Sequence, residues 1–80
     1  MSHPLKSPIE QFVIDTIKER RIAEGCSQRD LAYYLDVSEG FIGNVENPTY
    51  RAKYNLNHLN ELAKFLKCSP KDFLPEKPFK

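Results

Sequence analysis

Long hydrophobic runs are missing from this sequence. The longest uninterrupted apolar stretch is the five residues from Leu31 to Leu35, whereas a membrane-spanning helix needs about 20 residues. Residues 1–7 also lack the apolar centre of a secretory signal peptide. These absences exclude the membrane-spanning class and lead us to expect a cytoplasmic protein.

Cysteine is scarce, and the two that occur, Cys26 and Cys68, lie far apart in the chain. Neither belongs to a Cys-x-x-Cys pair or has a histidine at zinc-finger spacing, so we expect no structural metal and no cofactor. In a reducing compartment each cysteine is expected to be a small, buried apolar residue.

An excess of positive charge is also lacking. Twelve lysines and arginines stand against 11 aspartates and glutamates, which gives a net charge of +1. Nucleic-acid binding must therefore depend on where the charges lie, because the total does not indicate it. The sequence contains no recognisable nucleophile with its base and no paired carboxylates, and no known spacing joins His3 or His58 to a cysteine. We therefore expect a binding protein and not an enzyme.

What the sequence does contain is a series of helix signals. The start signals are Ser7-Pro8, Ser27, Ser38, Asn55 and Ser69-Pro70, each followed by apolar residues at helical spacing. They predict helices over 8–24, from 28 to just before Asp36, over about 39–46, from 56 to about 66, and a last single turn that ends at Pro75. No segment alternates with period two. The predicted fold is all-α, with five helices over residues 8–74, an N-terminal arm at 1–7 and a C-terminal tail at 75–80.

The second and third of these helices form one unit within residues 28–47. Because only about three residues join them, the two helices must cross steeply, which requires a small residue where their backbones approach. Ala32 is that residue. The apolar side chains expected to pack this unit against the first and fourth helices are Leu31, Leu35, Val37, Ile42 and Val45.

The order of residues in this unit carries a family resemblance. The positions concerned are Ser27-Gln28, Leu31-Ala32, Leu35, Val37-Ser38, Ile42 and Val45-Glu46-Asn47. With this pattern the chain resembles the Cro- and cI-like phage repressors (the XRE family) from about residue 13 to residue 74. The resemblance implies a compact repressor-like domain whose second motif helix enters the major groove of DNA.

Two positions depart from the family pattern. Asp36 stands in the turn where the family most often has glycine, and Pro48 follows Asn47 where glycine is also usual. We expect either a left-handed backbone at Asp36 or a slightly altered turn, and a different path for the loop after Asn47.

The exposed face of the expected recognition helix follows from a rotation of about 100° per residue. With Ile42 and Val45 buried, the expected base-reading residues on and beside the opposite face are Glu39, Gly40, Phe41, Gly43 and Asn44. Asn44 is the best reader because its amide can form a bidentate pair with adenine. Glu39 can accept from cytosine, and Phe41 either contacts a thymine methyl or packs in the fold. The two glycines either permit close approach to DNA or are tolerated surface residues.

Phosphate contacts need hydrogen-bond donors around this helix. The expected donors are Gln28, Arg29, Asn47, Tyr50, Arg51 and Lys53. The loop 49–54 contains two cations, three hydroxyls and no acid, and the alternative interpretation is an ordinary solvated loop. The family resemblance gives Arg21 another role, because related repressors pair an arginine at this point with a glutamate, here Glu46. That implies a structural ion pair.

The sequence therefore predicts a small transcriptional regulator that binds specific double-stranded DNA. Because one recognition helix reads only a few base pairs, we expect a homodimer, with Leu74 and Phe79 as candidate contacts between the copies. No small-molecule ligand is indicated. Within DNA binding, the small size also suits the antitoxin of a toxin-antitoxin pair or a restriction-modification controller protein. The alternative outside that class is a protein-interaction module that keeps this fold.

Overall fold

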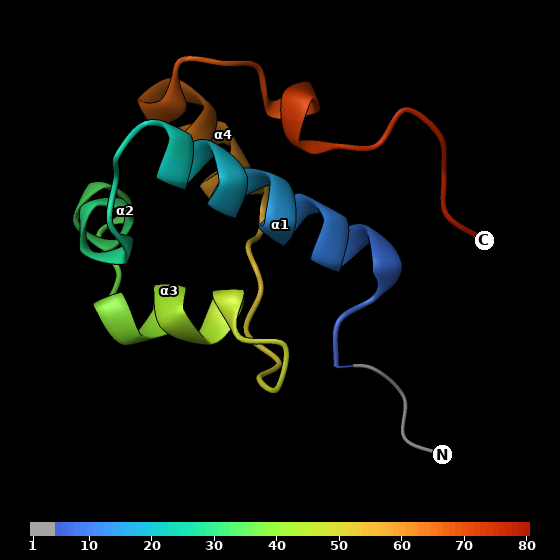
Figure 1. Ribbon diagram of the computed structural model, residues 1–80, viewed down its shortest axis with the longest axis horizontal. Coiled ribbons are helices and arrows are strands. Elements are labelled where there is room, and N and C mark those ends of the chain that lie inside the picture. The colour runs from blue at the N-terminus through green and yellow to red at the C-terminus, as the bar shows by residue number, and fades with distance from the viewer. Residues whose placement is uncertain (1–4) are drawn as a thin grey trace.

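The computed structural model describes residues 5–80, and its regular elements are all helices. Its four α-helices are α1 (Pro8–Ala23), α2 (Gln28–Leu35), α3 (Glu39–Glu46) and α4 (Leu56–Leu66). A short 3-10 helix, η1 (Pro70–Phe73), follows, and no strand forms between residues 5 and 80 (Figure 1). The all-α prediction is confirmed. Most of the expected N-terminal arm, with His3, lies outside the described residues.

The expected count of five helices is wrong, because the described chain forms four α-helices. The fifth expected helix is only the single 3-10 turn η1. Its next residue, Leu74, is already extended at φ −105° and ψ 150°, as expected for a residue that precedes Pro75. The first helix is also one residue shorter than predicted, since Glu24 is the residue that caps α1.

Side-chain caps explain why the helices begin where they do. The Ser27 hydroxyl accepts from the Asp30 amide at 3.0 Å, and the Asp30 carboxylate accepts from the Ser27 amide at 2.8 Å. Reciprocal caps of this kind also begin α1 and α4. Between α2 and α3, Asp36 has φ 58° and ψ 47°, which is the left-handed backbone, the first of the two alternatives expected there. Gly25, with φ 72°, follows α1 as expected.

The core lies where the four α-helices meet. The side chains with no solvent exposure are Ile17, Leu31, Ile42, Val45, Leu62 and Phe73. Phe73 therefore belongs to the core, as predicted, and anchors η1 against α1 and α4. The prediction of buried cysteines is only partly met, because the free thiols Cys26 and Cys68 are half-buried.

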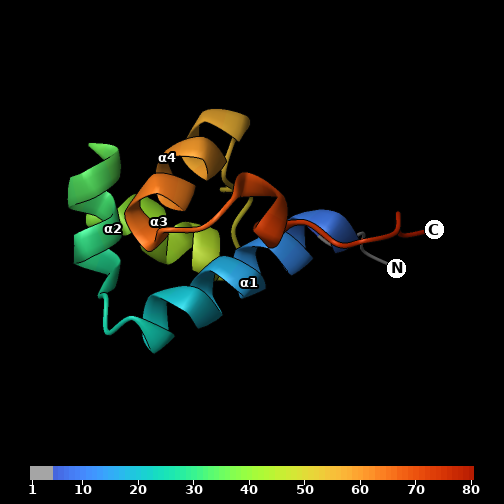
Figure 2. The ribbon, with the colours of Figure 1, turned by 90° about the horizontal axis from the view of Figure 1, so that it is seen from above.

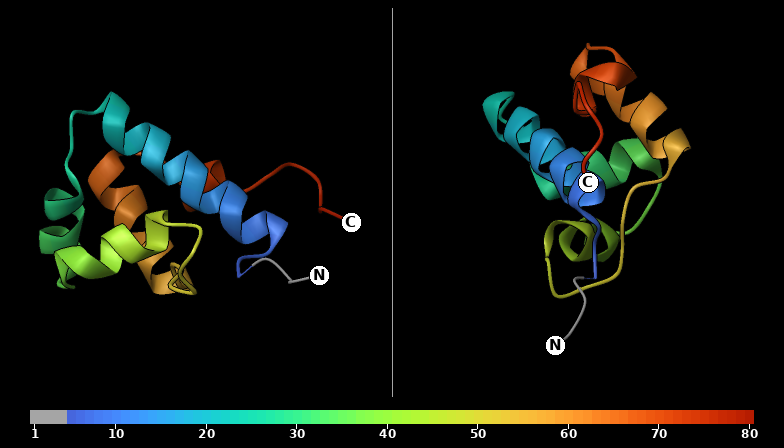
Figure 3. Two further views of the ribbon diagram at one scale, coloured as in Figure 1. Left: turned by 60° about the horizontal axis from the view of Figure 1, so that its bottom comes forward. Right: turned by 90° about the vertical axis from the view of Figure 1, so that its right-hand side faces the viewer.

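The arrangement of the helices leaves α3 at one face of the domain. Figure 2 shows α2 standing across the end of α1, and both views in Figure 3 place α3 below α1. Glu39 and Gly40, in the first turn of α3, are exposed to solvent. Within residues 5–80, none of the helices has the length and apolar character of a membrane span.

Candidate nucleic-acid interface

The helix-turn-helix consists of α2, the linker 36–38 and α3. Ile42 and Val45 are fully buried on the inner side of α3, and Ala32 is 4% exposed where α2 lies against it. The outer side carries the exposed Glu39 and Gly40 and the half-exposed Gly43 and Asn44. This is the face that helical spacing predicted. One end of it is open to solvent along the first turn of α3.

An ion pair with α1 holds the last turn of α3. Arg21 Nε and Nη2 donate to the two carboxylate oxygens of Glu46, each at 3.0 Å, and Nη1 donates to the Cys26 carbonyl at 2.8 Å. The Arg21 and Glu46 side chains are only 11% and 4% exposed. The structure thus brings together the two residues that the family resemblance pairs, in the bidentate geometry that gives strong charge-assisted bonds.

Gln28 belongs to the same buried network. Its Nε2 donates to Glu46 Oε1 at 3.0 Å, so the side-chain amide that we expected to bind phosphate joins α2 to α3 in this structure. The sequence places Gln28 at the start of α2, where amides often meet phosphate. It does not show that the side chain turns inward to complete the coordination of a buried carboxylate.

Lys6 occupies a position at this interface that the sequence reasoning missed. It is 5% exposed, and its Nζ donates to the carbonyl oxygens of Val45 and Asn47 at 2.7 Å and of Asn44 at 3.3 Å. Burial lowers the pKa of Lys6, the charge of Lys53 lowers it further, and Glu10 opposes both. The one signal in the sequence was indirect. The last turn of α3 has no basic residue, although a helix C-terminus favours a cation.

Two predicted DNA contacts at the start of the motif helices pair with each other. Arg29 Nε lies 3.4 Å from Glu39 Oε1, and the two side chains are 81% and 53% exposed. Such an exposed pair adds little stability, so either side chain can turn to another partner. Asn44 differs from both, since its side-chain amide makes no hydrogen bond within residues 5–80 and retains its donor and acceptor groups.

Phe41 and the two glycines of α3 differ in what surrounds them. Phe41 is half-buried against the core, and its ring centroid lies 5.5 Å from that of His58. This favours the packing alternative over a thymine contact. A Cβ at Gly40 would lie 3.9 Å from Ser38 Oγ, and one at Gly43 would lie 3.5 Å from Gln28 Oε1. Both positions therefore have room for a Cβ, and packing within the protein does not require glycine at either of them.

The loop between α3 and α4 carries the remaining predicted phosphate donors. Asn47 Oδ1 accepts from Thr49 N at 3.0 Å and Thr49 Oγ1 at 2.7 Å, which leaves the Asn47 Nδ2 group for another partner. Tyr50 and Arg51 are exposed. Lys53 is not free, because its Nζ lies 3.0 Å from Glu10 Oε1 on α1. The loop itself contains no acid, but folding brings the Glu10 carboxylate of α1 to Lys53.

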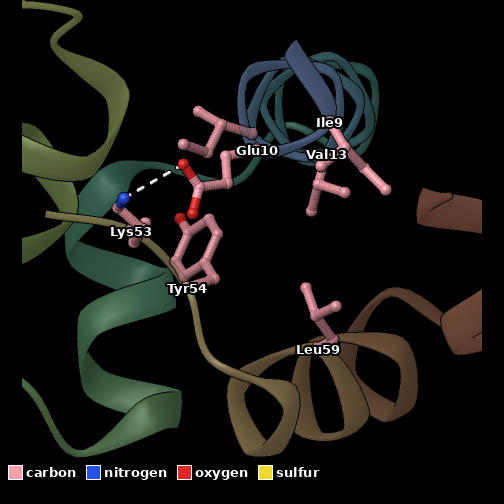
Figure 4. A pocket seen from close by; sticks show the side chains of 7 residues that line it. Ile9, Glu10, Val13, Lys53, Tyr54 and Leu59 are labelled. Atoms are coloured by element: carbon pink, nitrogen blue, oxygen red, sulfur yellow. Dashed lines mark hydrogen bonds and ion pairs between the residues drawn. The ribbon is translucent and has the colours of Figure 1, made fainter. Parts of the chain in front are cut away.

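A small cavity of about 90 Å³ lies beside the Glu10–Lys53 pair, between α1 and α4. Figure 4 shows Val13 and Leu59 projecting into it from opposite sides. Tyr54 lines the same cavity, and its hydroxyl is buried with no hydrogen-bond partner in the described chain. Burial, assisted by the Glu46 charge, raises the pKa of Tyr54. One of the three loop hydroxyls is therefore not available to phosphate.

Comparison with known proteins identifies the family. The model of the Cro/C1-type HTH DNA-binding domain matches residues 16–75. The chain belongs to this Cro/C1-type helix-turn-helix family. It is a DNA-binding domain of the regulator class, and the predicted resemblance is confirmed.

Solved structures similar to this Cro/C1-type domain include two restriction-modification controller proteins. C.AhdI from Aeromonas hydrophila is 26% identical, with a TM-score of 0.67 over 81% of this chain and 94% of that chain. A mutant of C.Esp1396I is 28% identical, with a TM-score of 0.71 over 85% and 84%. The hypothetical transcription factor NHTF from Neisseria, at 19% identity, shares the fold with a TM-score of 0.71 over 84% and 75%. A search of curated protein sequences finds no significant match.

The two candidate dimer contacts of the Cro/C1-type domain lie near its C-terminus. Leu74 is 44% exposed directly after η1. Phe79 is 47% exposed, and its ring centroid lies 5.9 Å from that of Phe12 on α1. Part of the Phe79 surface is therefore covered within one copy, and the two side chains remain exposed to a similar degree.

Proposed function

We propose that this Cro/C1-type domain binds specific double-stranded DNA as a homodimeric transcriptional regulator, with α3 in the major groove. The observation that carries the proposal is the contrast between the two sides of α3. Its inner side is fixed by buried Ile42 and Val45, while the Asn44 amide beside its outer face has no hydrogen-bond partner in the described residues. A rigidly supported amide suits bidentate pairing with adenine.

The contacts of the free protein refine which donors meet phosphate. Arg51 and Tyr50 are exposed, and Asn47 keeps its Nδ2 group, so these three supply the backbone contacts. Arg29 and Lys53 contribute only by exchanging a carboxylate for a phosphate. Gln28 is assigned to the protein's own network with Glu46.

The homodimer follows from the amount of sequence that one copy can read. The described chain has a single helix-turn-helix, so two copies related by a two-fold axis provide the specificity that a regulator needs. The half-sites are then about 10 base pairs apart, or a multiple of that spacing. Similarity to two restriction-modification controller proteins supports a regulator of the controller type. Light scattering and footprinting that find one monomer on an asymmetric site would contradict this part of the proposal.

Selection of bound sequences from random duplex DNA is the direct test of specific binding. The selected duplex should bind at least about a thousandfold more tightly than random DNA at near-physiological salt. Equal, weak affinity for every duplex would instead favour a protein-interaction module. The ion pairs Arg29–Glu39 and Lys53–Glu10 give that alternative its support, because they reduce the positive charge around α3.

Two variants separate base reading from phosphate binding. Asn44→Ala should cost about 1 to 3 kcal/mol on the selected duplex and relax one base preference per half-site, with little effect on random DNA. Arg51→Ala should weaken both duplexes alike and reduce the logarithmic salt slope by about 1 per monomer. Lys64→Ala on α4 is the control for loss of a positive charge, since Lys64 pairs with Glu61 on its own helix.

The assignment of base reading to Asn44 and phosphate binding to Arg51 is contradicted if either variant shows the effect expected of the other. If Asn44→Ala lowers both affinities equally, or if Arg51→Ala changes the preferred base, then the assigned orientation of α3 on DNA is wrong. The control should leave affinity for both duplexes within about twofold of the parent, which corresponds to a difference of less than about 0.5 kcal/mol.

A further inference from the structure

Lys6 places a buried ammonium group against the end of the recognition helix. Lysine is almost never fully buried unless it has partners, and this one is 5% exposed. Its partners are three carbonyl oxygens, those of Asn44, Val45 and Asn47, at 3.3, 2.7 and 2.7 Å. An ammonium group has three N–H donors, so the number of donors matches the number of carbonyls.

Two of these carbonyls also accept from backbone amides, Asn44 O from Asn47 N at 3.2 Å and Asn47 O from Tyr50 N at 3.1 Å, whereas Lys6 is the partner of Val45 O in the described chain. The last carbonyls of an α-helix have no partner within the helix and lie at the negative end of its dipole. In α3 no basic residue occupies the last turn, and Pro48 follows the capping residue and has no amide hydrogen to donate. An eight-residue helix is also marginal without outside support. Lys6 therefore supplies the positive charge and the N–H donors that the end of α3 does not have in its own sequence.

One of the three carbonyls belongs to Asn44, the residue to which we assign base reading, and another to Asn47, where the loop with Arg51 begins. The same turn of α3 is also held by Arg21, near the end of α1, which binds the Glu46 side chain. Cations from before α1 and from its last turn thus fix the last turn of α3. Figure 1 shows the chain descending from the start of α1 toward the loop after α3.

We propose that Lys6 is a positioning residue for sequence reading, which holds the last turn of α3 so that the Asn44 amide meets its base at the required angle. The inference rests on the proposed DNA-binding function. Lys6 is not assigned a phosphate contact, because its N–H donors are directed to protein carbonyls. Its loss is therefore expected to reduce discrimination between duplexes more than it reduces affinity for random DNA.

The test compares Lys6→Met, Lys6→Arg and the control Lys64→Met with the parent, on selected and random duplexes across a salt series. Methionine keeps an unbranched side chain without the charge. Lys6→Met should lower the ratio of selected to random affinity by about tenfold, within the range that one bidentate base contact supplies, while the salt slope stays unchanged. Lys64→Met should leave this ratio unchanged, because Lys64 lies on α4 and pairs with Glu61 of the same helix.

Lys6→Arg keeps the inference testable if Lys6→Met does not fold. Arginine retains the charge at the end of α3, but its planar guanidinium cannot direct three donors as an ammonium does. It should fold and lose preference by about threefold, between the parent and Lys6→Met. Folded variants that keep the parental ratio would show that Lys6 has only a structural role. A fall in both affinities with a smaller salt slope would make Lys6 a phosphate contact; either result overturns the proposal.

A measurement without DNA distinguishes this inference from the proposed function. Amide hydrogen exchange at residues 44–50 should accelerate in Lys6→Met while exchange in α1 and α4 remains at the parental rate. If amide exchange at these residues is unchanged in Lys6→Met, then Lys6 does not stabilise the last turn of α3. If the parent itself prefers no duplex, specific binding fails and the reading role of Lys6 fails with it. That failure is recognisable because it is present before any substitution.

Discussion

The substitution Arg21→Ala would leave the Glu46 carboxylate, which is 4% exposed, with Gln28 as its remaining side-chain donor in the described chain. Removing one partner of a buried ion pair costs about 3 to 5 kcal/mol. A domain of 80 residues has an unfolding free energy of about 4 to 12 kcal/mol. The substitution therefore removes at least a quarter of the stability. The midpoint of thermal unfolding should fall by at least about 12 °C.

Urea and thermal unfolding of the variants would measure this effect. Lys64→Ala is the matched control, because Lys64 Nζ also lies 3.0 Å from a carboxylate oxygen of Glu61, but the two side chains are 62% and 44% exposed. Its loss should cost less than about 1 kcal/mol. The double substitution Arg21→Met with Glu46→Leu should recover part of the loss, because apolar replacement of a whole buried pair is often close to neutral.

The structural role of Arg21 would be refuted by a particular combination of results. An Arg21→Ala protein that unfolds at the parental midpoint but no longer binds the selected duplex would make Arg21 a DNA contact. Glu46→Ala should destabilise the domain to a similar degree, because it leaves the guanidinium with only the Cys26 carbonyl among its present partners. A large difference between these two single variants would show that the pair is not the main source of the effect.

Three further predictions concern stability. Alanine at Gly40 or Gly43 should raise the unfolding free energy by about 1 kcal/mol, since neither Cβ would meet more than an ordinary contact. If the same variant binds the selected duplex more weakly, the glycine permits close approach to DNA. If binding is unchanged, the glycine is a tolerated surface residue. Tyr54→Phe should unfold at the parental urea midpoint or above, because it removes a buried hydroxyl without a partner in the described chain; a lower midpoint would reveal a bond to that hydroxyl. Acidification should destabilise the domain as pH falls below about 6.5, the ordinary pKa of histidine, because His58 Nδ1 accepts from the Asn55 amide at 3.0 Å and burial lowers the pKa of His58. The folded state favours neutral His58, so the stability that His58 contributes is present above its unfolded pKa and is lost as pH falls toward its folded pKa. His58→Gln should flatten that part of the plot of unfolding free energy against pH. An unaltered plot would show that His58 is not the source of the acid sensitivity.

The helices and their limits could be predicted because their signals are local. Ser27 and Asp30 cap α2 through bonds between residues three apart, and the apolar spacing that buries Ile42 and Val45 lies within one helix. The same local spacing gave the outer face of α3. The left-handed backbone of Asp36 was one of two alternatives that the sequence allowed, because aspartate tolerates that geometry better than most residues.

The partners of long polar side chains could not be predicted in this way. Lys6 and Asn47 are 41 positions apart, and Lys53 and Glu10 are 43 apart, so only the packed arrangement brings each pair together. The loop 49–54 contains no acid, so nothing in the sequence indicated that Lys53 is paired with a carboxylate from α1. Arg21 and Glu46 were paired through the family resemblance alone, since 25 positions separate them and no periodic pattern joins them.

The positions of these long-range contacts explain how one short helix can have a firmly held last turn and a first turn that tolerates substitution. The buried polar anchors of α3, from Arg21, Gln28 and Lys6, are all made to residues 44–47. The first turn has the Ser38 cap and the exposed pair of Glu39 with Arg29. Because exposed pairs contribute little stability, substitutions near Glu39 and Gly40 can alter the surface offered to DNA without loosening the anchored turn. If α3 reads DNA as proposed, its first turn can vary without loss of folding stability, and the residue that combines base reading with anchoring is Asn44. Its carbonyl takes part in the anchoring while its side chain remains available to read.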